Sequence, residues 1–253
     1  MSKKLETKTP KKSGKAKGRA PLSRERVIET ALAMVDRAGL DALSMRTVAA
    51  ELGVEAMSLY RHVASKEALI EGIVALILDE IEVPPAGTPW REAMSRRARS
   101  TRAVFLRHPA ASILVESCST MTPSRLAYSN AVVGLLLGDG FTASEAYRAF
   151  LTLDSYVFGF VLQELSWPHP TDTRPREDAA AGPSVPPSVY PHFAKVMASV
   201  MQEVGRLGLV AAYESEFVLG LELVLDGIER LRRPEARRGA NVRPRAQPAR
   251  ASR

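Results

Sequence analysis

Apolar residues between positions 43 and 66 recur every three to four residues in two short blocks separated by Gly53. Each block, 45–52 and 56–63, fits one side of an α-helix. Gly53 tolerates the positive φ that a tight turn between two helices requires. Two helices that cross through so short a turn form a helix-turn-helix, whose second helix can enter the major groove of DNA. The pattern therefore predicts a DNA-binding motif.

The helical period recurs along most of the chain. Ser23, Ser44 and Ser65 are placed to cap helices, and Thr142 with Glu145 forms a capping box. Further helices are expected at 24–38, 66–83, 89–107, 109–116, 123–138, 143–167, 190–207 and 213–233. No stretch alternates between apolar and polar residues as a strand would. The predicted fold is therefore all-α, with an N-terminal three-helix helix-turn-helix DNA-binding domain and a larger helical domain for ligand binding and dimerisation.

Prolines that follow position 83 interrupt the helical pattern and divide the chain. The terminal segments have almost nothing to bury, and a long internal segment is rich in Pro, Thr, Asp and Ala. The predicted units are a disordered basic arm at 1–21, a DNA-binding domain at 22–83 that is linked through helix 66–83, an effector-binding and dimerisation domain at 84–233 with a mobile loop at 168–189, and a disordered Arg-rich tail at 234–253.

Charge is unevenly distributed along the 253 residues, whose net charge is +7. Residues 1–19 carry a net charge of +7 and residues 230–253 a net charge of +8, which leaves −8 for the rest. Basic tails attract polyanions in a salt-sensitive way; alternatively, these tails only solubilise the chain. Residues 20–70 hold six basic against seven acidic side chains, which is unusual for a DNA-binding domain. We therefore hypothesise that the arm before position 21 supplies much of the attraction to DNA.

Several functional classes are disfavoured by the composition. The chain has no apolar run of membrane-spanning length and no secretory signal, and its single cysteine fits a reducing compartment, so a cytoplasmic protein is expected. No Cys/His cluster has metal-site spacing, and no cofactor is expected. The glycines near 138–140 and 205–208 are typical of helix ends, and no catalytic constellation is visible, so an enzyme is disfavoured. An effector-independent architectural DNA-binding protein remains the alternative.

A capped helix that ends in glycine, followed by LSMRTVAAELGV and LYRHVASKEAL, resembles the DNA-binding domain of the tetracycline repressor (TetR) family. The segment FVLGLELVLDGIERL at 217–231, together with Trp90 and Gly140-Phe141, is similar to the C-terminal domain of the tetracycline-repressor class. The resemblance spans about 21–233. It implies a sequence-specific regulator, by default a repressor, that binds a palindromic operator in double-stranded DNA as a homodimer and is released by a small-molecule effector.

The predicted DNA contacts face away from the apolar side of the second helix or match contact positions of the family. They are Arg46, Ala56, Met57, Ser58, Tyr60, Arg61, His62 and Lys66. An arginine fork at Arg46 or Arg61 can bind guanine O6 and N7 together, and Tyr60 and Lys66 match phosphate-binding positions. For the two arginines the alternative is a solvated surface charge, and for Tyr60 it is partial packing in the core.

The resemblance also implies an effector pocket between helices of the larger domain. Its implied lining is Glu82, Arg97, Thr101, Val115, Cys118, Tyr147 and Phe150. Val115 stands at the position of a magnesium-binding histidine, and Glu82 and Arg97 replace polar drug contacts, so we expect an effector other than magnesium–tetracycline. Alternatively, Glu82 and Arg97 pair with each other. Cys118 is expected to be a small buried apolar residue.

The last helix and the helix that begins at 143 carry glycines that permit close approach. In the resembled class these two helices pair with their mates in a four-helix dimer interface. The predicted interface residues are Gly159, Phe217, Gly220, Leu221, Val224, Leu225 and Ile228. The alternative is a core face within one chain. A two-fold dimer would present its recognition helices about 34–36 Å apart.

Overall fold

The computed structural model describes residues 21–117, 121–166 and 187–232. These residues contain helices and no strand, so the all-α prediction is confirmed. The predicted disordered arm and tail, and most of the predicted loop at 168–189, lie outside the described residues. The helices are α1 (Arg24–Ala38), α2 (Met45–Leu52), α3 (Ala56–Leu59), α4 (Lys66–Glu80), α5 (Trp90–Arg107), α6 (Pro109–Ser117), α7 (Pro123–Gly138), α8 (Ala143–Ser166), α9 (Pro191–Leu207) and α10 (Leu209–Leu231), with a 3₁₀ turn at Leu40–Ala42.

Local capping signals determine where most helices begin. Ser23, Ser44 and Ser65 each accept a hydrogen bond from the backbone N–H three residues ahead, over 3.1–3.3 Å. Thr142 and Glu145 form the predicted reciprocal capping box, in which the backbone N–H of Thr142 donates to Glu145 Oε2 over 2.8 Å. The predicted starts of α1, α2, α4 and α8 are therefore confirmed.

Three helix boundaries differ from the prediction by three residues or more. Helix α3 ends at Leu59 and not at 63, because the His62 N–H donates to the Leu59 carbonyl three residues back and tightens the chain into a turn. Helix α4 ends at Glu80. Two residues later, the backbone N–H of Glu82 donates to Ser100 Oγ of α5 over 2.8 Å. Helix α10 begins at Leu209, directly after Gly208 (φ 82°) ends α9.

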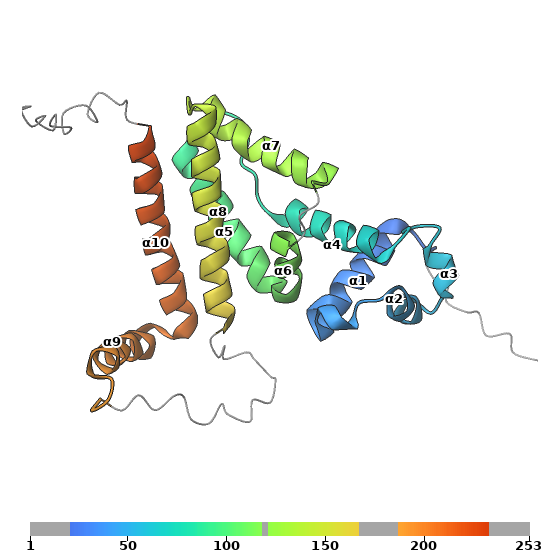
Figure 1. Ribbon diagram of the computed structural model, residues 1–253, viewed down its shortest axis with the longest axis horizontal. Coiled ribbons are helices and arrows are strands. Elements are labelled where there is room, and N and C mark those ends of the chain that lie inside the picture. Colours follow the sequence, from blue (N-terminus) through green and yellow to red (C-terminus); the bar gives the residue numbers. More distant parts are fainter. Residues whose placement is uncertain (1–20, 118–120, 167–186, 233–253) are drawn as a thin grey trace, which may run out of the picture.

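The helices fall into two groups that share α4 (Figure 1). Helices α1 to α3 gather at one end of the molecule, and α4 contacts α1 there. Towards the other end α4 contacts α6 and α7, while α5, α8 and α10 pack side by side. Helix α9 contacts α10 and contributes no buried side chain. Helix α4 is thus common to the cores of both groups.

Candidate DNA-binding surface and ligand cavity

Helices α2 and α3 form a compact helix-turn-helix. Gly53 closes α2 in the left-handed conformation (φ 63°, ψ 42°), which a residue with a side chain adopts at a cost. Leu59 and Val63 are buried, so the opposite side of this segment is turned outwards. Met57 is 73% exposed and Tyr60 47% exposed. The burial of one side thus fixes which side chains are presented to solvent.

All eight predicted DNA contacts reach the surface of this end of the molecule. Arg46, Met57, Tyr60, Arg61 and Lys66 are exposed, and the remaining three, Ala56, Ser58 and His62, are partly exposed. The three cations among them, Arg46, Arg61 and Lys66, make no salt bridge with any described residue. The neighbouring Arg37, by contrast, is paired with Glu51 over 3.2 Å.

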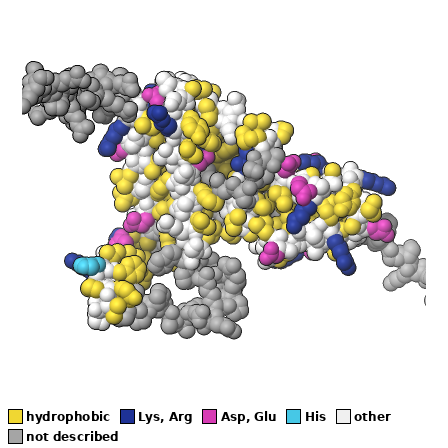
Figure 2. Space-filling view, viewed as in Figure 1, with side chains coloured by type: hydrophobic (Ala, Val, Ile, Leu, Met, Phe, Trp, Pro, Cys, Tyr) yellow, Lys and Arg dark blue, Asp and Glu magenta, His cyan; other side chains and the backbone are white. Residues whose placement is uncertain are grey.

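The surface around the helix-turn-helix is of mixed charge. Figure 2 shows Lys and Arg side chains that project from this end of the molecule among Asp and Glu side chains. This agrees with the near balance of acids and bases in residues 20–70. On the face that Figure 2 shows, the Lys and Arg side chains lie among acidic ones and do not gather in one basic patch.

A cavity lies among α4, α5, α6, α7 and α8 and encloses about 30 Å³. One or two water molecules would fill such a volume. Its apolar lining comes from the end of α4 and the segment just after it, and from α5, α6 and α8: Leu78, Ile81, Phe105, Val115, Val157 and Phe158. Its polar lining consists of Arg97, Thr101, Tyr128 and Asp154.

Arg97 is the polar centre of this cavity and is only 2% exposed. Its Nε donates to Tyr128 Oη of α7 over 2.8 Å, and its Nη2 donates to Asp154 Oδ1 of α8. The guanidinium carbon lies 5.5 Å from the Tyr128 ring centroid and 5.3 Å from that of Phe150, distances at which a ring face attracts a cation. Burial, more than any other effect, raises the pKa of Tyr128, which keeps the phenol neutral.

Only some of the residues predicted to line an effector pocket lie at this cavity. Arg97, Thr101 and Val115 line the cavity, and Phe150 borders it through Arg97. Tyr147 lies 64% exposed on the outer side of α8, so the prediction that it lines the cavity is wrong. Cys118 lies outside the described residues.

The prediction for Glu82 is also wrong. Its side chain is exposed and pairs with Arg96, because α4 has already ended and the chain at this point runs along the outside of α5. The alternative pairing of Glu82 with Arg97 does not form either, since Arg97 binds Asp154. Adjacent arginines on α5 thus point to different sides of the helix.

Two polar residues of the cavity, Tyr128 and Asp154, were not predicted from the sequence. Asp154 lies on α8 among Phe150, Val157 and Phe158, so a single acid on an otherwise apolar stripe was the available signal. No comparable signal marks Tyr128, because its partner Arg97 lies 31 residues earlier in the chain.

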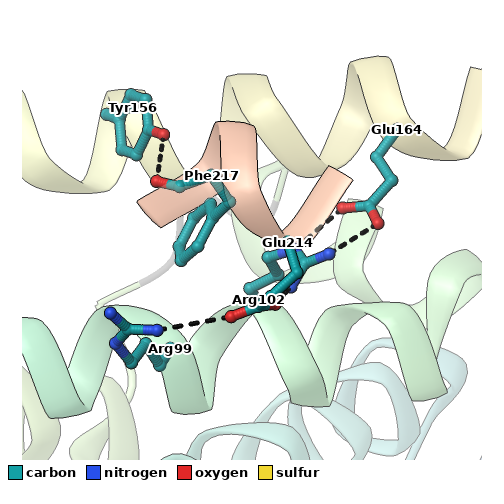
Figure 3. Close-up of polar contacts among 6 residues, drawn as sticks. All are labelled: Arg99, Arg102, Tyr156, Glu164, Glu214 and Phe217. Carbon is teal, nitrogen blue, oxygen red and sulfur yellow. Dashed lines mark hydrogen bonds and ion pairs between the residues drawn. The ribbon is translucent and has the colours of Figure 1, made fainter. Parts of the chain in front are cut away.

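A second buried ion pair joins α5, α8 and α10 (Figure 3). Arg102 donates through Nε and Nη2 to the two carboxylate oxygens of Glu164, over 2.8 and 2.7 Å, and through Nη1 to Glu214. Arg99 also reaches Glu214, over 3.3 Å. The Phe217 ring lies against the Arg102 guanidinium, 5.1 Å from its central carbon. These contacts fix the register of α10 against α5 and α8.

Four of the seven predicted interface residues are core residues of the chain itself. Phe217, Leu221, Leu225 and Ile228 are almost completely buried within the chain, where α10 packs on α5 and α8, so a partner subunit cannot reach them. For these four the prediction is wrong, and the alternative of an intramolecular face is correct.

Gly220 permits a close approach between α10 and α8, which belong to the same chain. A Cβ there would lie 2.4 Å from Tyr156 Oη of α8, and that hydroxyl donates to the Phe217 carbonyl over 2.7 Å. Val224 is partly buried against the same core, and a Cβ at Gly159 would meet nothing within 4 Å.

Two family models match the chain and together cover most of it. The model "Bacterial regulatory proteins, tetR family" matches residues 27–73, and the model "Tetracyclin repressor-like, C-terminal domain" matches residues 83–232. The second match alone includes more than half of the chain. No helix within the described ranges is long and apolar enough to cross a membrane.

Known proteins are similar over nearly the same span. The HTH-type transcriptional repressor DrrR1 of Streptomyces coeruleorubidus is 33% identical over 86% of this chain and 82% of its own length. The class D tetracycline repressor of Escherichia coli is 27% identical over 83% of this chain and 90% of its own. Among solved structures, ActR of Streptomyces coelicolor aligns with a TM-score of 0.63 at 27% identity, over 83% of this chain and 96% of that one. ActR has also been solved in complex with actinorhodin.

Proposed function

Because the chain belongs to the TetR family of bacterial transcriptional regulators, we propose that it binds a palindromic operator as a homodimer and releases it when an effector enters the cavity around Arg97. Members of this family are DNA-binding, ligand-responsive regulators and not enzymes, and repression by occupying the operator is the proposed mode. Residues 22–83 are the proposed DNA-binding domain, and residues 84–233 are the proposed effector-binding and dimerisation domain.

The observation that carries the proposal is the position of α4. This helix begins at Lys66, beside the helix-turn-helix, and its last turn supplies Leu78 to the cavity, which Ile81 lines directly after it. Fifteen helical residues span about 22 Å. A helix is stiff over such a length, so a displacement at Leu78 is transmitted to Lys66. The cavity and the DNA-binding surface are therefore mechanically joined.

Effector entry would use this connection. The cavity holds about 30 Å³, whereas pockets for small-molecule ligands are typically about 300–1,000 Å³. A ligand must therefore push its walls apart, and the end of α4 is one of them. The resulting tilt of α4 changes the distance between the recognition helices of a dimer, which lowers operator affinity.

DNA recognition is assigned to the exposed, unpaired side chains of the helix-turn-helix. Arg46 and Arg61 have free guanidinium groups for base edges or phosphates, Met57 offers an apolar contact to a thymine methyl, and Tyr60 and Lys66 are proposed to bind phosphates. Lys66 is also the first residue of α4, whose free N–H groups favour an anion.

Dimerisation is assigned to the outer sides of α8 and α10, in place of the residues of α10 that the sequence predicted and that are buried. Four leucines there are about half exposed or more: Leu151, Leu162, Leu219 and Leu223. Exposed apolar side chains on two neighbouring helices are typical of a surface that a partner covers. Gly159 lies on the outer part of α8, where it permits close approach of a second helix.

The effector is proposed to differ from magnesium–tetracycline. Val115, an apolar side chain, lines the cavity where the resemblance places a metal-binding histidine. In the part of the chain that the structure describes, no group of three or more His, Cys, Asp or Glu side chains is placed to hold a metal ion.

Selection of bound duplexes from a random DNA library by the full chain tests the proposal. We expect enrichment of one inverted repeat, a protein–DNA complex with two protomers, and its dissociation by at least one compound of a small-molecule collection. Magnesium–tetracycline should leave the complex intact. Failure to enrich any sequence would refute the proposed function.

A further inference from the structure

A histidine at the joint between α5 and α6 contacts both groups of helices. His108 follows α5 and precedes Pro109, the first residue of α6. Its Nδ1 lies 2.7 Å from Asp36 Oδ2 of α1, and its Nε2 lies 3.3 Å from Glu80 Oε2 at the end of α4. Arg107, the last residue of α5, also pairs with Glu80. We call Asp36, Glu80, Arg107 and His108 the His108 cluster.

The geometry of the His108 cluster selects one charge state of the imidazole. A carboxylate only accepts hydrogen bonds, so both ring nitrogens must carry a proton for both contacts to form. Only the imidazolium has two N–H groups, whereas a neutral ring turns a lone pair towards one of the carboxylates. The side chain of His108 is only 12% exposed, so water replaces a lost contact poorly. With an imidazolium the cluster is also neutral, because two carboxylates face two cations.

Helices α1 and α4 form one unit that this cluster fastens to the larger group. Gly72 of α4 lies so close to α1 that a Cβ there would come within 2.5 Å of Ile28 Cδ1. Such tight packing leaves the two helices little freedom to slide past each other. Helix α6 contacts both of them, and Figure 1 shows it beside α4. The His108 cluster therefore ties α1 and α4 together to the α5–α6 joint.

The orientation of α1 sets where the recognition helix stands in a dimer. Helix α2 packs on α1 and α3 packs on α2, so a rotation of α1 carries α3 with it. In a two-fold dimer both recognition helices must meet half-sites about 34–36 Å apart at the same time. Binding to unrelated DNA makes no such demand, because phosphate contacts dominate it. The cluster therefore affects binding to an inverted repeat far more than binding to unrelated DNA.

We propose that His108 is a positioning residue for operator binding, which as an imidazolium joins Asp36 to Glu80 and holds the recognition helices at the operator spacing. Glu80 is the last residue of α4, so the tilt of α4 that releases the operator pulls Glu80 away from His108. The intact cluster thus favours operator binding, and the operator affinity falls when His108 loses its proton as the pH rises. This assignment rests on the proposed function, because it needs a dimer on an inverted repeat.

The test measures DNA affinity by fluorescence anisotropy at about pH 6 and about pH 8, a range over which histidine side chains change charge. The full chain is titrated against the selected inverted repeat and against an unrelated duplex of equal length, at one salt concentration. We expect the preference for the repeat to fall about fivefold from the lower to the higher pH, as one part-exposed charged contact in each of two protomers permits. A preference that does not change with pH would overturn the proposal.

Histidine variants identify the group that titrates. His108→Gln is neutral at both pH values and should remove the pH dependence of the preference. His192→Gln is the matched control, because His192 is exposed on α9, which packs on α10; it should keep the pH dependence of the parent. His62→Gln removes the histidine of the DNA-binding surface, which faces either duplex, and should also keep the pH dependence of the preference. A dependence that survives in His108→Gln, or that disappears in His62→Gln, would contradict the assignment.

Asp36→Asn keeps the test decisive if His108→Gln does not fold. This variant removes the carboxylate on α1 and should flatten the pH profile as His108→Gln does, whereas Glu29→Gln, also exposed on α1, should not. If both cluster variants weaken binding to the two duplexes equally at both pH values, the cluster only stabilises the fold and the proposal fails. The proposed function is judged separately by operator selection. A chain that selects an inverted repeat but has one preference at both pH values keeps the function and loses the role of His108.

Discussion

Replacing Glu164 by glutamine removes one member of the buried ion pair between α5 and α8. Glu164 is 1% exposed, and both of its carboxylate oxygens accept from Arg102, over 2.7 and 2.8 Å. A glutamine of the same shape can accept only one of these bonds and turns an N–H₂ group towards the guanidinium. Arg102 is then left buried with its charge compensated only by Glu214.

The expected loss of stability follows from this geometry. Removing one partner of a buried pair costs about 3–5 kcal/mol because the other charge stays buried. Glu214 still binds Arg102 but is 48% exposed, so it offsets only part of the loss. We therefore expect Glu164→Gln to lower the free energy of unfolding by about 2–4 kcal/mol.

Urea unfolding followed by far-ultraviolet circular dichroism measures this loss. Parent and variants are compared at one protomer concentration, because dimerisation adds to the apparent stability. Glu214→Gln is the matched control: it removes a half-exposed partner of the same arginine and should cost no more than about 1 kcal/mol. If the two variants lose equal stability, the pair Arg102–Glu164 does not hold the helices together as described.

Four further substitutions and one deletion test other parts of the account. Tyr156→Phe removes the hydrogen bond to the Phe217 carbonyl and should cost about 1 kcal/mol. Burial raises the pKa of Tyr156 to about 12, so the stability linked to its protonation is present below pH 10 and is lost as the pH rises through about 12; the variant should lose less stability over that interval, measured by urea unfolding. Gly220→Ala forces a methyl group against the Tyr156 ring and should lower the free energy of unfolding by about 1–3 kcal/mol, whereas Gly134→Ala, in open space on α7, should raise it by about 0.5–1 kcal/mol. Arg46→Ala should weaken binding to the selected operator by about 1–3 kcal/mol in a fluorescence anisotropy titration, with less effect on unrelated DNA. Deleting residues 2–19 should make the dependence of log affinity on log salt less steep; an unchanged slope would refute a role for the basic arm.

Local signals in the sequence predicted the helices well. A capping serine or a proline acts within one turn, so Ser23, Ser65 and Pro123 mark helix starts without reference to the rest of the fold. The end of α4 was misjudged because it depends on a distant contact, the hydrogen bond from the Glu82 N–H to Ser100.

The direction in which α10 faces was not predictable from its sequence. Leu219 and Leu223 alternate along the helix with Leu221 and Leu225, so both sides are apolar and the helical period does not say which is buried. The structure places Leu221 and Leu225 inside and the other two outside. The partner of Arg97 was hidden for a similar reason, since Asp154 lies 57 residues away on another helix.

The central claim is that the exposed side chains of α2 and α3 read one DNA sequence. Its most direct test is the affinity of the full chain for the selected inverted repeat and for a scrambled duplex of equal length and composition, at one physiological salt concentration. We predict a preference of about 10³ or more for the repeat, with two protomers bound. Affinities within about tenfold of each other would contradict the claim and indicate an architectural DNA-binding protein.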